Sequence, residues 1–255
     1  MNKQYSALAR LYDDLMYDVP YEEWSRYIIE LLIGENAGPG AEVLEYACGT
    51  GNLTLPLARA GYHITAVDAS EEMLFCAQEK TRRNALQVNY ACGDMCCFRL
   101  NKPARAAVCA CDGVNYLLTE AELQRFFEQA YANLQARGVF LFDISSAYKL
   151  RHILGNEFYY DDGEDETCFW QNRFNEKSKT VRMELTIFIR RDGASYERQD
   201  ETHVQRAWER AEIERMLRDA GFAEVTAYGF LSGNEPERKE ERIQFCAVKK
   251  ETNDE

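Results

Sequence analysis

The segment 43–52 combines a short apolar run with an acidic residue and a loop of small residues. Glu45, Ala47, Gly49 and Gly51 follow one another at a spacing of two. A strand that leads into a helix through small residues lets backbone N–H groups approach a ligand at the carboxyl edge of a sheet. If the dinucleotide motif G-x-G-x-x-G is counted from Ala47, its three glycine positions hold Ala47, Gly49 and Asn52, so two of the three glycines are missing. The lysine that a P-loop requires after the loop is also missing. The spacing therefore favours an acidic residue followed by small-x-Gly-x-Gly.

A second acidic residue follows the next apolar run. Asp68 lies 19 residues after Gly49, a position from which a carboxylate can accept hydrogen bonds from both ribose hydroxyls. Taken alone, Asp68 could instead be an N-cap or form an Asx turn before the following helix. Gly93, Asp94 and Met95 come after the third apolar run and offer an acid for an exocyclic amine and a flat apolar contact for adenine. Alone they would be a turn, but in this order they predict a nucleoside ligand.

At these residues the sequence resembles the class I S-adenosylmethionine-dependent methyltransferases. The match covers most of the chain: residues 45–51 look like the first motif of that family, 68–74 like its ribose acid and following helix, and 93–95 like its adenine motif. Ala47 stands where the family usually has glycine, a change that leaves room for the cofactor. The resemblance implies S-adenosyl-L-methionine as cofactor and these binding residues: Tyr12, Tyr21, Glu45, Ala47, Cys48, Gly49, Asp68, Ala69, Met73, Gly93, Asp94, Met95, Cys111 and Asp112.

Two further segments are similar to the small-molecule branch of that family, which includes amino-sugar and glycine-type N-methyltransferases. The first runs from Tyr12 through Tyr21 to Trp24 and is similar to N-terminal helices that cover the cofactor there. Tyrosines suit a sulfonium because an aromatic face or a phenol oxygen favours a nearby positive charge. Amphipathic packing explains Tyr5, Tyr12, Tyr17 and Tyr21 equally well. The second segment is an antiparallel sheet inserted after the fifth strand.

The reaction implied by the resemblance is direct in-line methyl transfer to a nitrogen or oxygen of a small-molecule acceptor. Such a displacement needs no metal, and a base matters only where the nucleophile arrives protonated. Candidate bases are Asp112, Tyr116, Asp143 and His203, although we expect His203 to be a half-exposed strand residue. The sequence therefore predicts no particular catalytic residue. The alternatives are a nicotinamide-dependent oxidoreductase and a catalytically silent cofactor-binding or interaction protein.

The elements that must position these residues alternate between strand and helix. Strands are expected at 41–46, 63–67, 86–91, 104–111 and 138–144, and helices at 53–60, 71–84 and 120–135. A helix at 208–220 and strands near 224–230 and 243–249 follow. This rhythm predicts an α/β, Rossmann-like, doubly wound sheet of seven strands, mostly parallel, with an antiparallel last strand. Before it, apolar residues at helical spacing over 4–33 predict two helices separated near Pro20.

From residue 157 to 206 the apolar period changes to two. Val181, Met183, Leu185, Ile187 and Ile189 fall on one face, and 191–193 is a hairpin signal. With a third strand at 167–174, we expect a small inserted antiparallel sheet that either covers the acceptor or forms a dimer interface through its apolar face. The expected domains are a helical cap (1–35), a cofactor-binding core (36–150 and 207–255) and the insertion (151–206).

Composition narrows the class of partner. The 255 residues carry 30 Lys and Arg against 43 Asp and Glu, a net charge of −13, which opposes binding to nucleic acid or to an acidic membrane surface. Nine cysteines without a secretory signal are typical of a reduced cytoplasmic protein, and their spacing predicts no zinc site. We therefore expect a cytoplasmic monomer or homodimer that acts on a small molecule.

Overall fold

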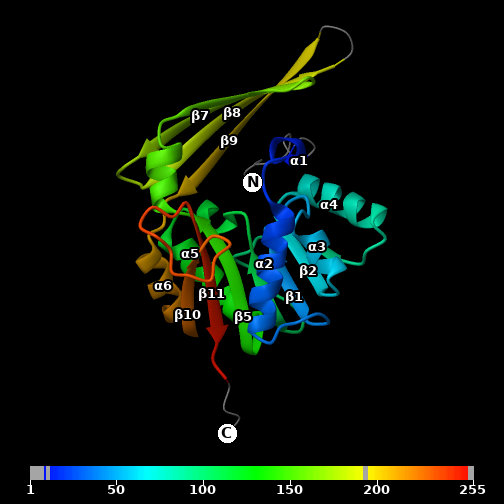
Figure 1. Cartoon of the computed structure of the whole chain (residues 1–255), viewed down its shortest axis with the longest axis vertical. Coiled ribbons are helices and arrows are strands. Elements are labelled where there is room, and N and C mark those ends of the chain that lie inside the picture. Colours follow the sequence, from blue (N-terminus) through cyan, green and yellow to red (C-terminus); the bar gives the residue numbers. More distant parts are fainter. Residues whose placement is uncertain (1–8, 10–11, 192–194, 252–255) are drawn as a thin grey trace.

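The computed structural model describes residues 9, 12–191 and 195–251 and contains two separate sheets (Figure 1). The larger sheet has the strand order β10-β11-β5-β4-β1-β2-β3, in which only β11 runs antiparallel to its neighbours. This confirms the predicted seven-stranded sheet. Its strands are β1 (Glu42–Tyr46), β2 (His63–Asp68), β3 (Asn89–Cys92), β4 (Ala104–Cys109), β5 (Leu134–Ser145), β10 (Phe222–Gly229) and β11 (Arg242–Lys249).

Helices cover both faces of this sheet because its central strands are apolar on both sides. In β4 every residue except Arg105 is buried. On one face α2 (Tyr21–Gly34) and α3 (Thr54–Arg59) pack with Val43, Val108 and Leu141. On the other face α5 (Glu120–Ala132) and α6 (Arg210–Asp219) pack with Phe140 and Phe142. A further helix, α4 (Glu71–Arg83), links β2 to β3. Its N-cap is Ser70, whose side chain accepts a hydrogen bond from the Met73 backbone N–H.

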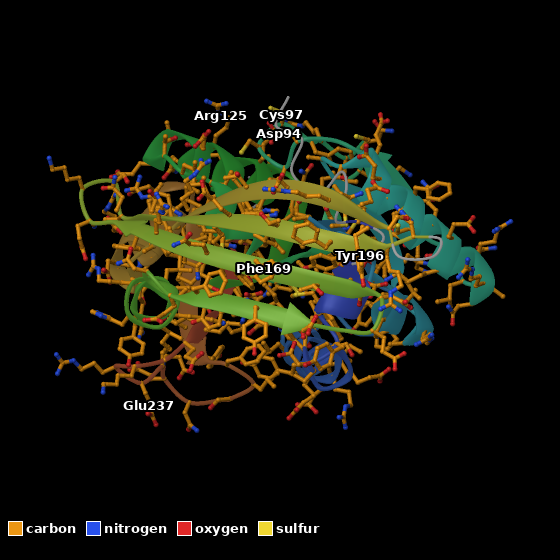
Figure 2. All side chains as sticks on the ribbon, turned by 90° about the horizontal axis from the view of Figure 1, so that it is seen from above. Asp94, Cys97, Arg125, Phe169, Tyr196 and Glu237 are labelled. Atoms are coloured by element: carbon orange, nitrogen blue, oxygen red, sulfur yellow. The ribbon has the colours of Figure 1, made fainter. Side chains whose placement is uncertain are left out.

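The second sheet has the order β6-β7-β8-β9 and stands above the carboxyl ends of the parallel strands (Figure 1). Its strands are β6 (Phe158–Asp162), β7 (Glu166–Asn175), β8 (Thr180–Arg190) and β9 (Tyr196–Arg206), joined to β5 through a π-helical turn, η3 (Lys149–Leu154). Seen from above, it lies across the molecule with Phe169 and Tyr196 on its strands (Figure 2). The insertion therefore leaves from the carboxyl end of β5, as the sequence predicts.

The apolar face of the inserted sheet is buried within the chain itself. Val181, Met183, Leu185 and Ile187 of β8 pack with Leu150 of η3, and Tyr12 packs against the same cluster. Ile189 is only partly buried. A single chain therefore buries most of this face without a second copy, and the choice between an acceptor lid and an interface stays a prediction.

Several element bounds differ from the predictions. The third strand begins at Asn89 rather than at residue 86, and α5 ends at Ala132, directly before β5. The inserted sheet has four strands rather than three, because β6 pairs with β7 although all of its residues are exposed. The expected hairpin at 191–193 lies largely outside the described residues, but β8 and β9 pair through Arg190 and Tyr196 as it requires.

The N-terminal prediction is confirmed where the structure describes the chain. Two helices, α1 (Tyr12–Leu15) and α2, are separated just before Pro20, and Tyr5 lies outside the described residues. Among the described helices, none has the length and apolarity needed to cross a membrane.

Candidate functional site

Three of the predicted site residues have an unusual backbone conformation at the carboxyl edge of the sheet. Ala47, after β1, and Cys111 and Asp112, after β4, have φ angles of 49°, 57° and 50°. Residues other than glycine rarely adopt this left-handed conformation, and such strain is concentrated at functional sites. The Cβ of Ala47 also fills the space beside Gly113, where an added Cβ would lie 3.0 Å from it. Ala47 is therefore accommodated by the neighbouring glycine.

A small hollow lies between these two loops and the N-terminal helices. Its volume is about 40 Å³, and it is lined by Tyr12, Tyr21, Glu45, Ala47, Cys48, Gly49, Thr50, Asn52, Leu53, Ala110 and Cys111. Seven of the fourteen predicted cofactor residues thus meet at one place. Ligand pockets usually measure about 300–1,000 Å³, so this hollow is smaller than a nucleoside site.

Glu45 is the acidic residue that lines the hollow, and its pKa is strongly shifted. It is 3% exposed, and its Oε2 atom has no hydrogen-bond partner among the described residues. Burial, together with the nearby charge of Asp68, raises the pKa of Glu45 to about 8. A buried, unsatisfied carboxyl group is costly unless a donor or a cation is bound beside it.

Asp68 holds the glycine loop in place. Its Oδ2 atom accepts a 2.8 Å hydrogen bond from the Gly49 backbone N–H, and its Oδ1 atom accepts one of 2.9 Å from Ser70. Burial raises the pKa of Asp68 in spite of these bonds. Each carboxylate oxygen can accept a second hydrogen bond, so a diol can still bind here. The N-cap of α4 is Ser70, so Asp68 forms an Asx turn before the helix, and its contact with a ribose stays a prediction.

The predicted adenine residues lie beside Asp68 rather than in the hollow. The Gly93 backbone N–H donates to the Asp68 carbonyl at 2.9 Å, and Asp94 accepts a 2.8 Å bond from the Cys96 N–H. Met95 packs against the core, and Met73 is buried at the start of α4, four residues after Ala69. The end of β3 thus borders the end of β2, although these side chains do not line the hollow.

An acidic residue that the sequence analysis missed fixes the N-terminal cap to the glycine loop. Asp13 accepts hydrogen bonds from Thr50 (2.7 Å) and Asn52 (3.0 Å) and forms an ion pair with Lys80 (2.5 Å). Burial raises the pKa of Asp13, but the bonds to Lys80 and Thr50 outweigh it, so the pKa is lower than usual. The ionised Asp13 therefore holds α1 over the hollow.

A buried charge cluster joins the ends of β4, β5 and β11. Arg242 forms ion pairs with Asp143 and with Asp112 (2.8 Å), and its guanidinium lies 4.8 Å from the ring centre of Trp24 and 5.7 Å from that of Phe230. Burial raises the pKa of Asp112, but the Arg242 charge outweighs this and holds it below the ordinary value. For Asp143 burial prevails and its pKa is raised. Arg242, also missed by the sequence analysis, thus compensates both carboxylates, which makes Asp143 a poor candidate base.

The other two candidate bases contact each other. The Tyr116 hydroxyl, on the 3₁₀ helix η2 (Gly113–Tyr116), lies 3.3 Å from Nδ1 of His203 on β9. His203 is 4% exposed, so the prediction of a half-exposed strand residue is wrong. The inner face of β9 is polar yet buried, an arrangement that alternation alone does not reveal.

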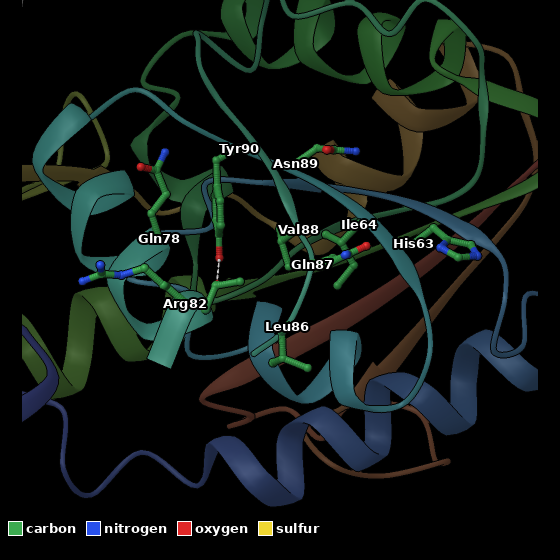
Figure 3. A pocket seen from close by; sticks show the side chains of 10 residues that line it. His63, Ile64, Gln78, Arg82, Leu86, Gln87, Val88, Asn89 and Tyr90 are labelled. Carbon is green, nitrogen blue, oxygen red and sulfur yellow. Dashed lines mark hydrogen bonds between the residues drawn. The ribbon is translucent and has the colours of Figure 1, made fainter. Parts of the chain in front are cut away.

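A larger groove lies near the amino ends of β2 and β3, beside α4 (Figure 3). It measures about 530 Å³ and is lined by His63, Ile64, Gln78, Thr81, Arg82, Leu86, Gln87, Val88, Asn89 and Tyr90. No predicted cofactor residue is in that set. Its Tyr90 hydroxyl is already paired with Thr81 at 2.7 Å. Because ligands of open α/β sheets bind at the carboxyl ends of the strands, the small hollow is the better candidate.

Comparison with known proteins identifies the family. Residues 43–138 match a family model described as a methyltransferase domain. The chain is 32% identical over 249 residues to a putative methyltransferase of Bacillus subtilis, covering 97% of this chain and 98% of that protein. The chain belongs to the class I S-adenosylmethionine-dependent methyltransferases.

Solved methyltransferase structures agree with this assignment. An S-adenosylmethionine-dependent methyltransferase from Clostridium acetobutylicum is 34% identical, with a TM-score of 0.87 and coverage of 96% of this chain and 99% of that one. The sugar N-methyltransferase KedS8 from Streptoalloteichus, 20% identical with a TM-score of 0.77 over 93% of this chain and 92% of its own, shares the fold. This methyltransferase therefore uses S-adenosylmethionine, and the unsatisfied Glu45 oxygen and the open space above Gly49 fit that cofactor.

Proposed function

We propose that this methyltransferase modifies a nitrogen or oxygen of a small-molecule acceptor held between the carboxyl edge of the large sheet and the inserted sheet. The observation that carries the proposal is the position of Tyr12. It lines the hollow and also packs against the buried face of the inserted sheet. The cofactor loop, the cap and the insertion thus meet around Tyr12, and an acceptor held where they meet would be small.

The cofactor residues follow from the same geometry. Glu45 would face the positive charge of the cofactor, Asp68 the ribose hydroxyls, and Gly93, Asp94 and Met95 the adenine. Tyr12, Tyr21, Ala47, Cys48, Gly49 and Cys111 would enclose its methionine end, and Ala69, Met73 and Asp112 would border the site. We expect three domains. The cap (1–35) would cover the cofactor, the core (36–150 and 207–255) would bind it, and the insertion (151–206) would select the acceptor.

S-adenosylmethionine supplies a methyl group on a sulfonium, open to in-line attack. The task of the protein is to bring the nucleophile into line and to exclude water, and orientation of this kind supplies much of the acceleration in such reactions. The closed cap excludes water, because Asp13 fixes α1 to the glycine loop. Gln205 of β9 donates a 2.5 Å hydrogen bond to Asp112 after β4, so the inserted sheet is fixed over the carboxyl edge where the acceptor would lie.

A transfer assay with radiolabelled S-adenosylmethionine tests the proposal. The enzyme is incubated separately with a small-molecule filtrate, the RNA and the protein of the same cells. We expect label in the filtrate fraction only. Label confined to RNA or protein would contradict the small-molecule acceptor without affecting the family assignment. As a second arm, NAD should not compete with S-adenosylmethionine for binding, since the loop lacks two of the three dinucleotide glycines.

A further inference from the structure

Three side chains from two elements form a continuous chain of polar contacts beside the proposed acceptor space. The Tyr116 hydroxyl lies 3.3 Å from Nδ1 of His203, and Nε2 of His203 lies 3.2 Å from a carboxylate oxygen of Glu201. His203 and Glu201 are 4% and 7% exposed, whereas Tyr116 is only partly buried. The chain thus runs from a partly accessible phenol into the interior of the protein.

The accessible end of this chain lies next to the cofactor hollow. Tyr116 is the last residue of η2, which follows Cys111 and Asp112 directly. Burial is the main cause of the raised pKa of Tyr12, which lines the hollow, and interactions with nearby groups, Asp112 and Tyr116 among them, add to it. The phenol therefore borders the space where the cofactor and the acceptor would meet.

Hydrogen bonds between the end of β9 and the 112–118 segment fix the distance between Tyr116 and His203. The Asn115 amide donates to the Arg206 carbonyl at 2.9 Å, and the Arg206 guanidinium donates to the Leu118 carbonyl at 2.9 Å. The Trp208 indole N–H donates to the Leu117 carbonyl at 3.1 Å. With the bond from Gln205 to Asp112, both sides of the tyrosine are attached to β9. Such preorganisation is what proton transfer requires.

The groups that face His203 determine its tautomer. A carboxylate only accepts, so Nε2 carries the proton towards Glu201 and Nδ1 accepts from the Tyr116 hydroxyl. The cross-strand neighbour of His203 on β8 is the apolar Met183. Two titratable groups contact the ring of His203, Glu201 from β9 and Tyr116 from η2. Tyr12 of α1 interacts in turn with Tyr116 and with Asp112 of the loop before η2.

We infer that Tyr116, His203 and Glu201 form a proton relay that deprotonates a hydroxyl group of the acceptor. This inference rests on the proposed function and narrows the nucleophile to oxygen. As the acceptor oxygen bonds to the methyl carbon, the carbon–sulfur bond breaks and its electron pair stays on sulfur. The hydroxyl proton passes to the Tyr116 oxygen while the proton of Tyr116 passes to Nδ1 of His203. Glu201 stabilises the resulting imidazolium, which loses its proton to solvent after product release.

A hydroxyl acceptor explains why a base is buried here. A neutral amine attacks with its own lone pair and loses a proton only afterwards, whereas a hydroxyl must lose its proton during the attack. Packing alone does not call for these side chains, since the adjacent positions on β8 are filled by Met183 and Leu185. Apolar side chains of similar volume are often at least as stabilising as a buried ion pair.

Kinetics with the labelled small-molecule fraction test the relay. We expect His203→Gln to lower kcat by about 10²–10⁴-fold at neutral pH, with affinity for S-adenosylmethionine unchanged. The lost rate should return as pH rises, because hydroxide replaces the missing base. Tyr116→Phe should behave likewise, and Glu201→Gln, a change to a positioning residue, should shift the pH profile with a smaller loss. The matched control is His63→Gln, an exposed histidine at the distant groove, which should keep wild-type rates.

A loss for His203→Gln that is equal at every pH would overturn the relay and leave His203 a packing residue. A labelled product that is an amine would overturn the assignment of an oxygen nucleophile. Nitrogen NMR of the histidines, with S-adenosylhomocysteine bound, tests the relay without any acceptor. We expect the His203 proton on Nε2 and a shift of the Nδ1 resonance in Tyr116→Phe. A proton on Nδ1 would overturn the relay, whatever the labelling assay shows. The absence of any labelled small molecule would contradict the proposed function instead.

Discussion

Replacement of Glu45 by glutamine separates the charge of this residue from its shape. The side chain is buried, and burial with the Asp68 charge raises its pKa from 4.5 to about 8. Between these two values the folded protein binds a proton that the unfolded chain releases, so the stability of the wild type falls as pH rises. Glutamine has no such dependence. We therefore expect Glu45→Gln to be more stable than the wild type in the absence of cofactor, increasingly so with rising pH.

The size of this effect follows from the pKa change. One pKa unit corresponds to about 1.4 kcal/mol, so the stability difference should be near zero at about pH 4.5, about 3 kcal/mol at pH 7 and about 5 kcal/mol above pH 8. Urea unfolding at pH 5 and pH 8.5 measures it. Glu42→Gln is the matched control, because it makes the same change at an exposed glutamate on the same strand.

Binding of S-adenosylmethionine should reduce the stability advantage of Glu45→Gln over the wild type. A positive charge beside Glu45 favours the carboxylate, so wild-type binding near pH 7 should release a proton, measurable by calorimetry in buffers of different ionisation enthalpy. Glu45→Gln should bind about 10- to 100-fold more weakly and release none, the loss expected for one charge-assisted hydrogen bond. A stability difference that does not change with pH would refute the buried, protonated Glu45. Unchanged affinity and no proton release in the wild type would refute its contact with the cofactor.

The other predictions concern the loop, the cap and the charge cluster. Gly49→Ala and Gly40→Ala both place a Cβ in open space at a positive φ, so each should cost about 1 kcal/mol of stability. Only Gly49→Ala should weaken S-adenosylmethionine binding, by more than tenfold. Equal affinities of the two variants would show that the loop does not approach the cofactor. Asp13→Ala should speed S-adenosylhomocysteine release about two- to fivefold in stopped-flow measurements, because it loosens the cap. Glu79→Ala removes an exposed ion pair on α4 and should leave the release rate unchanged. An unchanged rate for Asp13→Ala would mean that α1 need not open. Arg242→Met should cost about 3–5 kcal/mol, because it leaves the buried Asp143 and the partly buried Asp112 uncompensated, and the loss should shrink as pH falls and they become protonated. Arg198→Met, at an exposed pair, should cost much less, and equal losses would contradict the cluster.

The sequence could predict what depends on local spacing. The alternation of apolar runs and helices determined the large sheet, and the glycine loop with its acidic residues pointed to the carboxyl edge where Glu45 and Gly49 meet. The apolar period of β8 revealed the inserted sheet. Strand β6 was missed because all five of its residues are exposed and show no alternation.

What the sequence could not show depends on contacts between distant residues. Asp13 and Arg242 have a role only through partners that lie 37 or more residues away in the chain. His203 was placed wrongly for a similar reason. A strand whose inner positions are Glu201, His203 and Gln205 has the pattern of a solvent face, and only the fold of the insertion over Asp112 and Tyr116 buries it.

A crystal structure with S-adenosylhomocysteine bound tests most directly whether the hollow between the β1 and β4 loops is the cofactor site. The ligand should displace the closed arrangement of Tyr12 and Tyr21, with its amino group towards Glu45, its ribose on Asp68 and its sulfur facing the inserted sheet. A ligand found instead in the groove around Tyr90, or one that leaves Glu45 and Asp68 uncontacted, would contradict the account.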